Sequence, residues 1–100
     1  MIRAKDLAII ESVVQEHVPD GYEVFVFGSR VRGGDRKYSD IDIGIKGKKR
    51  LEMRKLGLIK AELEKSMLPY RIDVVDFKRV DDRFRDLVLS GEVLWIKTCD

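Results

Sequence analysis

The fold is decided by residues 22–45, which read YEVFVFGSRVRGGDRKYSDIDIGI. Residues 22–27 are a nearly continuous run of β-branched and aromatic side chains, which predicts a strand buried on both faces. Residues 40–45 alternate acidic and apolar side chains, as a half-buried strand does. Residues 30–39 between them are polar, basic and rich in glycine. We therefore expect two strands joined by a polar connection that can begin a short helix.

Helical periodicity lies on both sides of these strands. Apolar residues recur every three or four positions over residues 4–18 and 50–67, which predicts two amphipathic helices. Residues 71–77 predict a third strand, and residues 93–96 a possible edge strand. Between them, Asp81 or Asp82 can cap a last helix that ends at Gly91. This order predicts an α/β (α+β) fold, with a small mixed sheet of three to four strands flanked by helices.

Length and composition limit the function further. One hundred residues predict a single domain over residues 1–100. A net charge of +2 from 20 basic and 18 acidic residues does not suit an electrostatically driven DNA-binding protein. Cys99 is the single cysteine, which excludes an internal disulfide and a cysteine metal site. No apolar run reaches the roughly 18 residues of a membrane span, and no signal peptide begins the sequence, so we expect a cytoplasmic protein without membrane contact.

Three aspartates are candidate metal ligands. Asp40 and Asp42 are two residues apart on a predicted strand, so both side chains leave the same face. Asp73 lies in the next predicted strand, which can pair beside the first. Carboxylates this close repel one another unless a hard cation such as Mg²⁺ neutralises them. The alternative is a solvated strand face. Asp76 competes with Asp73, but a three-residue spacing places it on the other face.

Gly28 and Ser29 are candidate phosphate ligands. They follow a buried strand and precede a segment that can begin a helix, where free N–H groups and the Ser29 hydroxyl can hold phosphate oxygens. Ser29 can also cap that helix, a role compatible with phosphate binding. Arg30 and Arg32 can either clamp the same phosphates or remain solvent-exposed. A phosphate site beside a metal site predicts a nucleotide substrate.

The string GSRVRGGDRKYSDIDIGI, followed about thirty residues later by RIDVVDF, resembles the signature of the DNA polymerase beta-like nucleotidyltransferase superfamily. It is especially similar to the minimal nucleotidyltransferase (MNT) family. The resemblance implies that Gly28 and Ser29 hold the triphosphate. It implies that Asp40 and Asp42 are the main ligands of one or two Mg²⁺ ions. It also implies that Asp73 is a third ligand that helps to activate the attacking hydroxyl.

The resemblance also implies a partner and a substrate. MNT proteins pair with a helical HEPN toxin, often an RNase, and act as its antitoxin by transferring AMP from ATP to a tyrosine of that toxin. We therefore expect ATP as substrate and a hetero-oligomer with a HEPN-type toxin. The alternative is a non-catalytic antitoxin that neutralises the toxin by occlusion. Transfer to a small molecule has less support, because the chain has little length for an acceptor domain.

Several other residues have simpler interpretations. Six basic residues follow the second predicted strand, but a basic turn that enters a helix is usually solvated, so direct nucleic-acid binding is not expected. These residues are Lys46, Lys48, Lys49, Arg50, Arg54 and Lys55. Phe25, Phe27, Phe77 and Phe84 are expected in the core, whereas Leu94 and Trp95 can belong to the core or to an interface.

Overall fold

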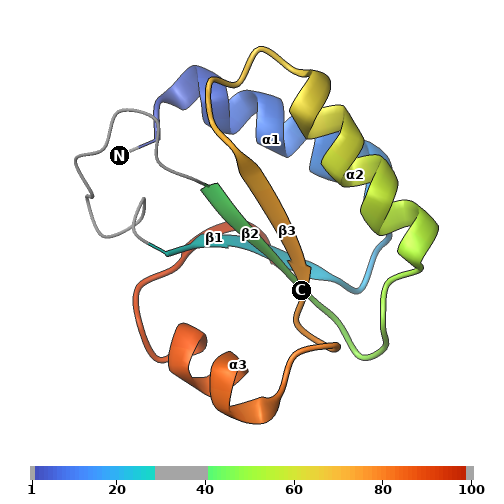
Figure 1. Ribbon diagram of the computed structural model, residues 1–100, viewed down its shortest axis with the longest axis vertical. Coiled ribbons are helices and arrows are strands. Elements are labelled where there is room, and N and C mark those ends of the chain that lie inside the picture. Colours follow the sequence, from blue (N-terminus) through green and yellow to red (C-terminus); the bar gives the residue numbers. More distant parts are fainter. Residues whose placement is uncertain (1, 29–40, 99–100) are drawn as a thin grey trace.

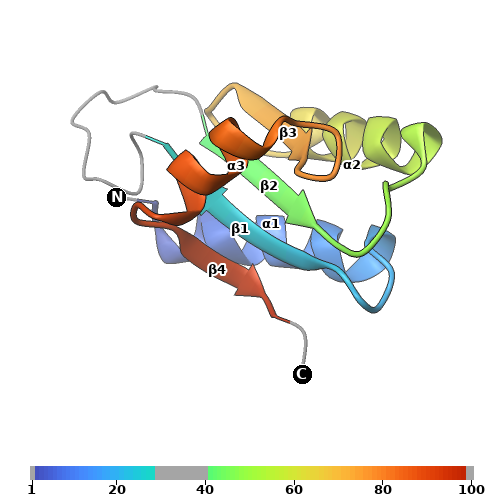
Figure 2. The ribbon, with the colours of Figure 1, turned by 90° about the horizontal axis from the view of Figure 1, so that it is seen from below.

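A four-stranded mixed sheet organises the computed structural model, which describes residues 2–28 and 41–98. The strand order is β3-β2-β1-β4, where β2 and β3 are parallel and the other pairs antiparallel. Figure 2 shows this order, with β4 at one edge and β3 at the other. The elements along the chain are α1 (Ala4–His17), β1 (Glu23–Phe27), β2 (Ile41–Lys46), α2 (Met53–Lys65), β3 (Ile72–Asp76), α3 (Asp82–Leu89) and β4 (Leu94–Lys97). The predicted fold class is therefore confirmed, whereas a helix after Ser29 would lie outside the described residues.

The main core lies between the sheet and the first two helices (Figure 1). Alternate residues of β1 and β2, such as Val24, Val26 and Ile43, are fully buried against Ile10 of α1 and Ile59 of α2. A branched side chain at every second position suits a strand with one face on helices. The opposite face of β1 carries Phe25 and Phe27, so this strand is buried on both faces, as predicted.

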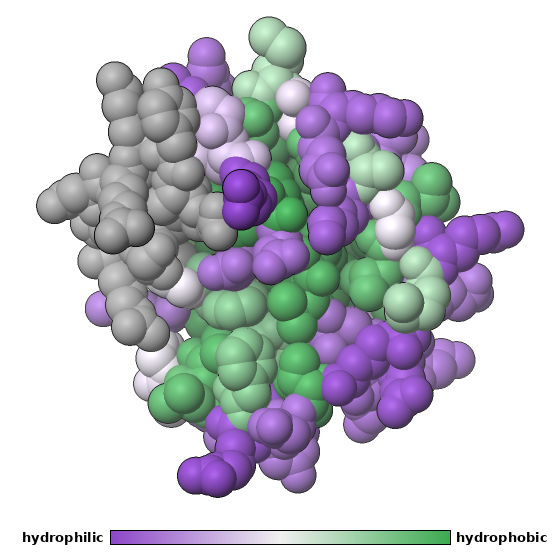
Figure 3. All heavy atoms as spheres, in the orientation of Figure 1, coloured by the Kyte–Doolittle hydropathy of each residue, from purple (hydrophilic) through white to green (hydrophobic). Residues whose placement is uncertain are grey.

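The second face of the sheet is covered only in part. Phe25, Phe27 and Phe77 form a small aromatic cluster there, with ring centroids 4.9–6.0 Å apart. The α3 helix packs beside this cluster but has no fully buried residue. Figure 3 shows hydrophobic residues exposed on this lower part of the molecule.

Two aromatic residues of this region are more exposed than typical core residues. The prediction that Phe84 belongs to the core is wrong: its ring contacts Phe27 and Phe77, but it is 39% exposed because α3, which carries it, lies at the surface and has no buried residue. Trp95 is 44% exposed and contacts Phe25 on one side. Trp95 is therefore a surface residue with one buried ring contact.

The start of α2 differs from the prediction. The periodicity predicts a helix from residue 50, but α2 begins at Met53. The Leu51 N–H donates to Asp76 at 2.8 Å, and Arg79 donates to the Leu51 carbonyl at 2.9 Å. These tertiary bonds hold Leu51 outside the helix. The last helix agrees with the prediction, because the Asp81 side chain accepts the Phe84 N–H at 2.8 Å.

Over residues 2–28 and 41–98, no helix combines the length and the apolar character that crossing a membrane requires. The cytoplasmic location stays a prediction.

Candidate active site

Asp42 and Asp73 are brought side by side by the parallel pairing of β2 and β3. The register places Asp42 directly opposite Asp73. Side chains opposite each other on adjacent strands leave the same face, about 5 Å apart at their Cα atoms. Phe27 of β1 is opposite Asp42 on the other side, so this is the aromatic face and not the face under α1 and α2. Sequence spacing alone did not fix this register.

Gly28 completes the described part of the site. It follows β1 with a φ of +91°, in the left-handed region that glycine adopts without strain. A Cβ built on Gly28 would lie 2.6 Å from the Asp42 Oδ2 atom. The backbone at Gly28 therefore passes so close to the Asp42 carboxylate that no side chain fits between them. Such an approach brings the main chain near any group bound at Asp42.

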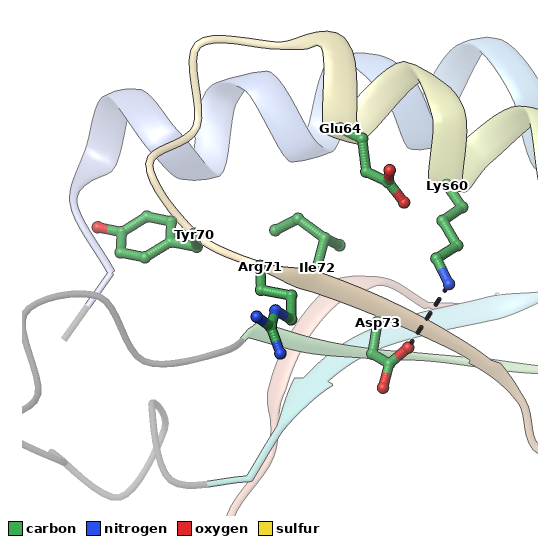
Figure 4. A pocket seen from close by; sticks show the side chains of 6 residues that line it. All are labelled: Lys60, Glu64, Tyr70, Arg71, Ile72 and Asp73. Carbon is green, nitrogen blue, oxygen red and sulfur yellow. Dashed lines mark ion pairs between the residues drawn. The ribbon is translucent and has the colours of Figure 1, made fainter.

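Asp73 lies at the open edge of the sheet, on the outermost strand. Its side chain is 66% exposed, and its Oδ1 atom is 3.9 Å from the Lys60 ammonium of α2. Both residues line a pocket of about 500 Å³ between the start of β3 and the second half of α2 (Figure 4). The nearby linear sequence did not indicate Lys60, because α2 reaches Asp73 only through the packing of the helix along β3.

Asp76 has a different role from Asp73. It is 2% exposed and faces the α2 side of the sheet, as its three-residue spacing from Asp73 predicts. Its carboxylate accepts hydrogen bonds from the N–H groups of Leu51 and Lys78 and from the Arg79 guanidinium. These bonds satisfy the carboxylate inside the fold. Asp76 is therefore a structural residue that ties the segment before α2 to the end of β3.

The two carboxylates that the structure describes at this site are chemically suited to bind Mg²⁺. Asp42 and Asp73 offer only oxygen atoms, which hard cations prefer, and two adjacent carboxylates create a local negative charge. Among residues 2–28 and 41–98, no group of three or more His, Cys, Asp or Glu residues could hold a metal ion. The third predicted carboxylate, Asp40, lies outside the described residues, as do Ser29, Arg30 and Arg32. The structure thus brings together Gly28, Asp42 and Asp73 of the seven predicted site residues.

Comparison with known families decides what kind of protein carries this site. The sequence profile described as "Polymerase beta, Nucleotidyltransferase" matches residues 8–99. The chain belongs to this nucleotidyltransferase family. The resemblance inferred from the sequence is therefore confirmed.

The nucleotidyltransferase has a curated relative in Haemophilus influenzae, described as probable protein adenylyltransferase MntA. The two are 37% identical over 87 residues, which cover 87% of this chain and 75% of the relative. This identity over most of both chains shows that the two proteins belong to the same family.

Solved structures share the fold of the nucleotidyltransferase. A chain of a toxin-antitoxin crystal structure with AMP-PNP aligns with a TM-score of 0.75 and 21% identity, over 91% of this chain and 72% of that chain. A chain of the structure of a tri-AMPylated Shewanella oneidensis HEPN toxin in complex with an MNT antitoxin aligns with a TM-score of 0.71 and 19% identity. That alignment covers 96% of this chain and 72% of the other.

Proposed function

We propose that this nucleotidyltransferase transfers AMP from ATP to a tyrosine hydroxyl of a HEPN toxin and acts as its antitoxin. The observation that carries the proposal is the β2–β3 register, which aligns Asp42 with Asp73 beside the close approach of Gly28. Family membership gives this arrangement its chemistry, and the 37% identical relative described as a protein adenylyltransferase supports AMP as the transferred group. The partner class is supported by neighbouring structures of HEPN toxin with MNT antitoxin.

Each site residue has a distinct role in the proposal. Gly28 and Ser29 bind the triphosphate, and Arg30 and Arg32 clamp its outer oxygens. Asp40, Asp42 and Asp73 would hold one or two Mg²⁺ ions. Bound Mg²⁺ would neutralise charge that develops on the phosphate oxygens during transfer.

The proposed reaction is an in-line displacement at the α-phosphorus of ATP. The acceptor hydroxyl oxygen forms a bond to phosphorus, and the bond to the bridging oxygen of pyrophosphate breaks, so pyrophosphate leaves with the electron pair. The hydroxyl proton passes to the Asp73 carboxylate, which is exposed at the sheet edge and accessible to an acceptor. The products are an AMP-tyrosine ester and pyrophosphate.

The proposal is tested with α-labelled ATP, Mg²⁺ and a HEPN toxin co-expressed with the protein. We expect label on the toxin, and a loss of at least about a hundredfold in rate for Asp42→Asn and Asp73→Asn, because each removes a charge next to the reacting phosphate. Asp20→Asn is the matched control, since Asp20 is exposed and lies before β1, at the opposite end of that strand from Gly28. Label on neither protein with the wild type contradicts the proposal.

The same variants separate catalysis from occlusion. If the antitoxin acts by AMP transfer, Asp42→Asn should fail to neutralise the toxin in cells while still binding it. If Asp42→Asn neutralises as well as the wild type, occlusion is the mechanism. Circular dichroism checks that the variant is folded, because Asp42 is only partly buried and its replacement should leave the core intact.

A further inference from the structure

The pocket beside Asp73 lies on the side of the site away from Gly28. In the strand order β3-β2-β1-β4, Gly28 follows β1, whereas Asp73 is on the outer strand, and the pocket lies between that strand and α2. The pocket has a volume of about 500 Å³, within the usual range of ligand sites. Figure 4 shows that two elements contribute its walls, α2 and the start of β3 with the residues before it. Its lining residues are Lys60, Glu64, Tyr70, Arg71, Ile72 and Asp73.

In-line geometry assigns this pocket to the acceptor. The attacking oxygen and the leaving pyrophosphate lie on opposite sides of the α-phosphorus. If the triphosphate is bound at Gly28, on the β1 side of the site, the acceptor hydroxyl arrives from the β3 side. The pocket lies at the β3 edge, and Asp73, the proposed proton acceptor, is one of its lining residues. This step rests on the proposed function.

Some polar groups of the pocket already have partners inside the protein, and others can bind a ligand. The Tyr70 hydroxyl donates to Asp6 at 2.9 Å, and Lys60 pairs with Asp73 at 3.9 Å. Within residues 2–28 and 41–98, neither the Arg71 guanidinium nor the Glu64 carboxylate has a hydrogen-bond or ion-pair partner. If Asp73 binds Mg²⁺, its negative charge no longer compensates Lys60. Two cations, Lys60 and Arg71, then face one anion, Glu64.

We infer that the acceptor is a hydroxyl on an acidic segment, and that Arg71 and Lys60 bind carboxylates next to it. Arg71 is suited to this role because a guanidinium binds a carboxylate with two parallel hydrogen bonds. The backbone carbonyl of Arg71 accepts the Ile41 N–H at 2.8 Å, which fixes the main chain at the pocket rim. The residue therefore combines a fixed backbone with an available side chain.

The inference is tested with two synthetic tyrosine peptides, one with aspartate on both sides of the tyrosine and one with lysine. Peptide binding to the full chain is measured through the amide chemical shifts of Ile72 and Asp73, with Mg²⁺ and a non-transferable ATP analogue present. We expect the acidic peptide to bind about tenfold more tightly than the basic one, a difference typical of two partly exposed charge contacts.

Three variants assign this preference to the pocket. Arg71→Glu should abolish or reverse it, and Glu64→Gln should increase it about twofold to threefold because one repelling charge is removed. Arg54→Glu is the matched control, with the same charge change in the first turn of α2, away from the pocket. Affinity for the ATP analogue should stay unchanged in Arg71→Glu.

The peptide-binding experiment tests the pocket separately from AMP transfer. If AMP transfer fails with every acceptor, the peptide preference still reports on the pocket. Equal binding of both peptides, or an unchanged preference in both Arg71→Glu and Glu64→Gln, overturns the inference. A parallel loss of ATP affinity in Arg71→Glu also overturns it, since the pocket would then bind the nucleotide.

Discussion

At the scale of single residues, Gly28 shows how one position can combine a backbone requirement with a chemical one. Its positive φ is one that glycine adopts without strain, and its missing side chain leaves room for the Asp42 Oδ2 atom. Gly21 has nearly the same conformation, with a φ of +92°, but no atom lies within 4 Å of a Cβ built there. A side chain at Gly21 would therefore cause backbone strain alone, whereas a side chain at Gly28 would cause both backbone strain and a steric clash.

We expect Gly28→Ala and Gly21→Ala each to lower the free energy of unfolding by about 1–2 kcal/mol, because both force alanine into the left-handed region. Only Gly28→Ala should also reduce AMP transfer, by more than tenfold, because its methyl group displaces the Asp42 carboxylate. Urea denaturation and a labelled-ATP assay measure the two effects. Equal transfer rates in the two variants would show that the close approach is not needed for function.

At the scale of elements, a buried carboxylate ties the first helix to the segment that enters β3. Asp6 of α1 is 1% exposed and accepts hydrogen bonds from Tyr70 at 2.9 Å and Arg3 at 3.1 Å. Burial acts to raise the pKa of Asp6, but the hydrogen bonds from Tyr70 and Arg3 outweigh it and hold the pKa below its usual value. This contact positions the residues immediately before Ile72 and Asp73.

The lowered pKa of Asp6 predicts a pH dependence of stability. The unfolded carboxyl group titrates near pH 4, so the contribution of Asp6 is fully present above that pH. It is lost as the pH falls through the lower pKa of the folded state. We expect Asp6→Asn to lower the free energy of unfolding by about 1–3 kcal/mol at pH 7, because its hydrogen bonds involve an ionised group.

Urea titrations at pH 7 and pH 3 should show that the difference between wild type and Asp6→Asn becomes smaller in acid. Tyr70→Phe provides an independent variant, since it removes one donor and leaves the carboxylate and Arg3 in place. A difference that grows on acidification would contradict the assigned direction of the pKa shift.

At the scale of the whole molecule, ligand binding should stabilise the fold. A ligand that binds only the folded state at ten times its Kd adds about 1.4 kcal/mol, which is on the order of 5–10 °C in Tm for a chain of this size. We expect this shift with Mg²⁺ and ATP together. Removing Mg²⁺ with a chelator should abolish it, and Asp42→Asn should reduce it strongly.

Differential scanning fluorimetry measures this shift, with Asp20→Asn as the control that keeps it. A full shift with ATP in the presence of chelator would contradict the proposed part of Mg²⁺ in nucleotide binding. The single-domain organisation over residues 1–100 also stays a prediction, which one cooperative transition in these melts would support.

The sequence by itself determined the kinds and order of the elements in the described residues, because hydrophobic periodicity is a local property of residues such as the aromatic run before Gly28. It also determined the family, because the spacing between Gly28, Asp42 and Asp73 is a property of the linear sequence. Tertiary structure alone decided that Asp42 lies opposite Asp73 and that Lys60 reaches the same carboxylate. It also decided that Phe84 stays partly exposed. The reason is that strand register, helix placement and burial arise from contacts between segments distant in sequence, which no local pattern encodes.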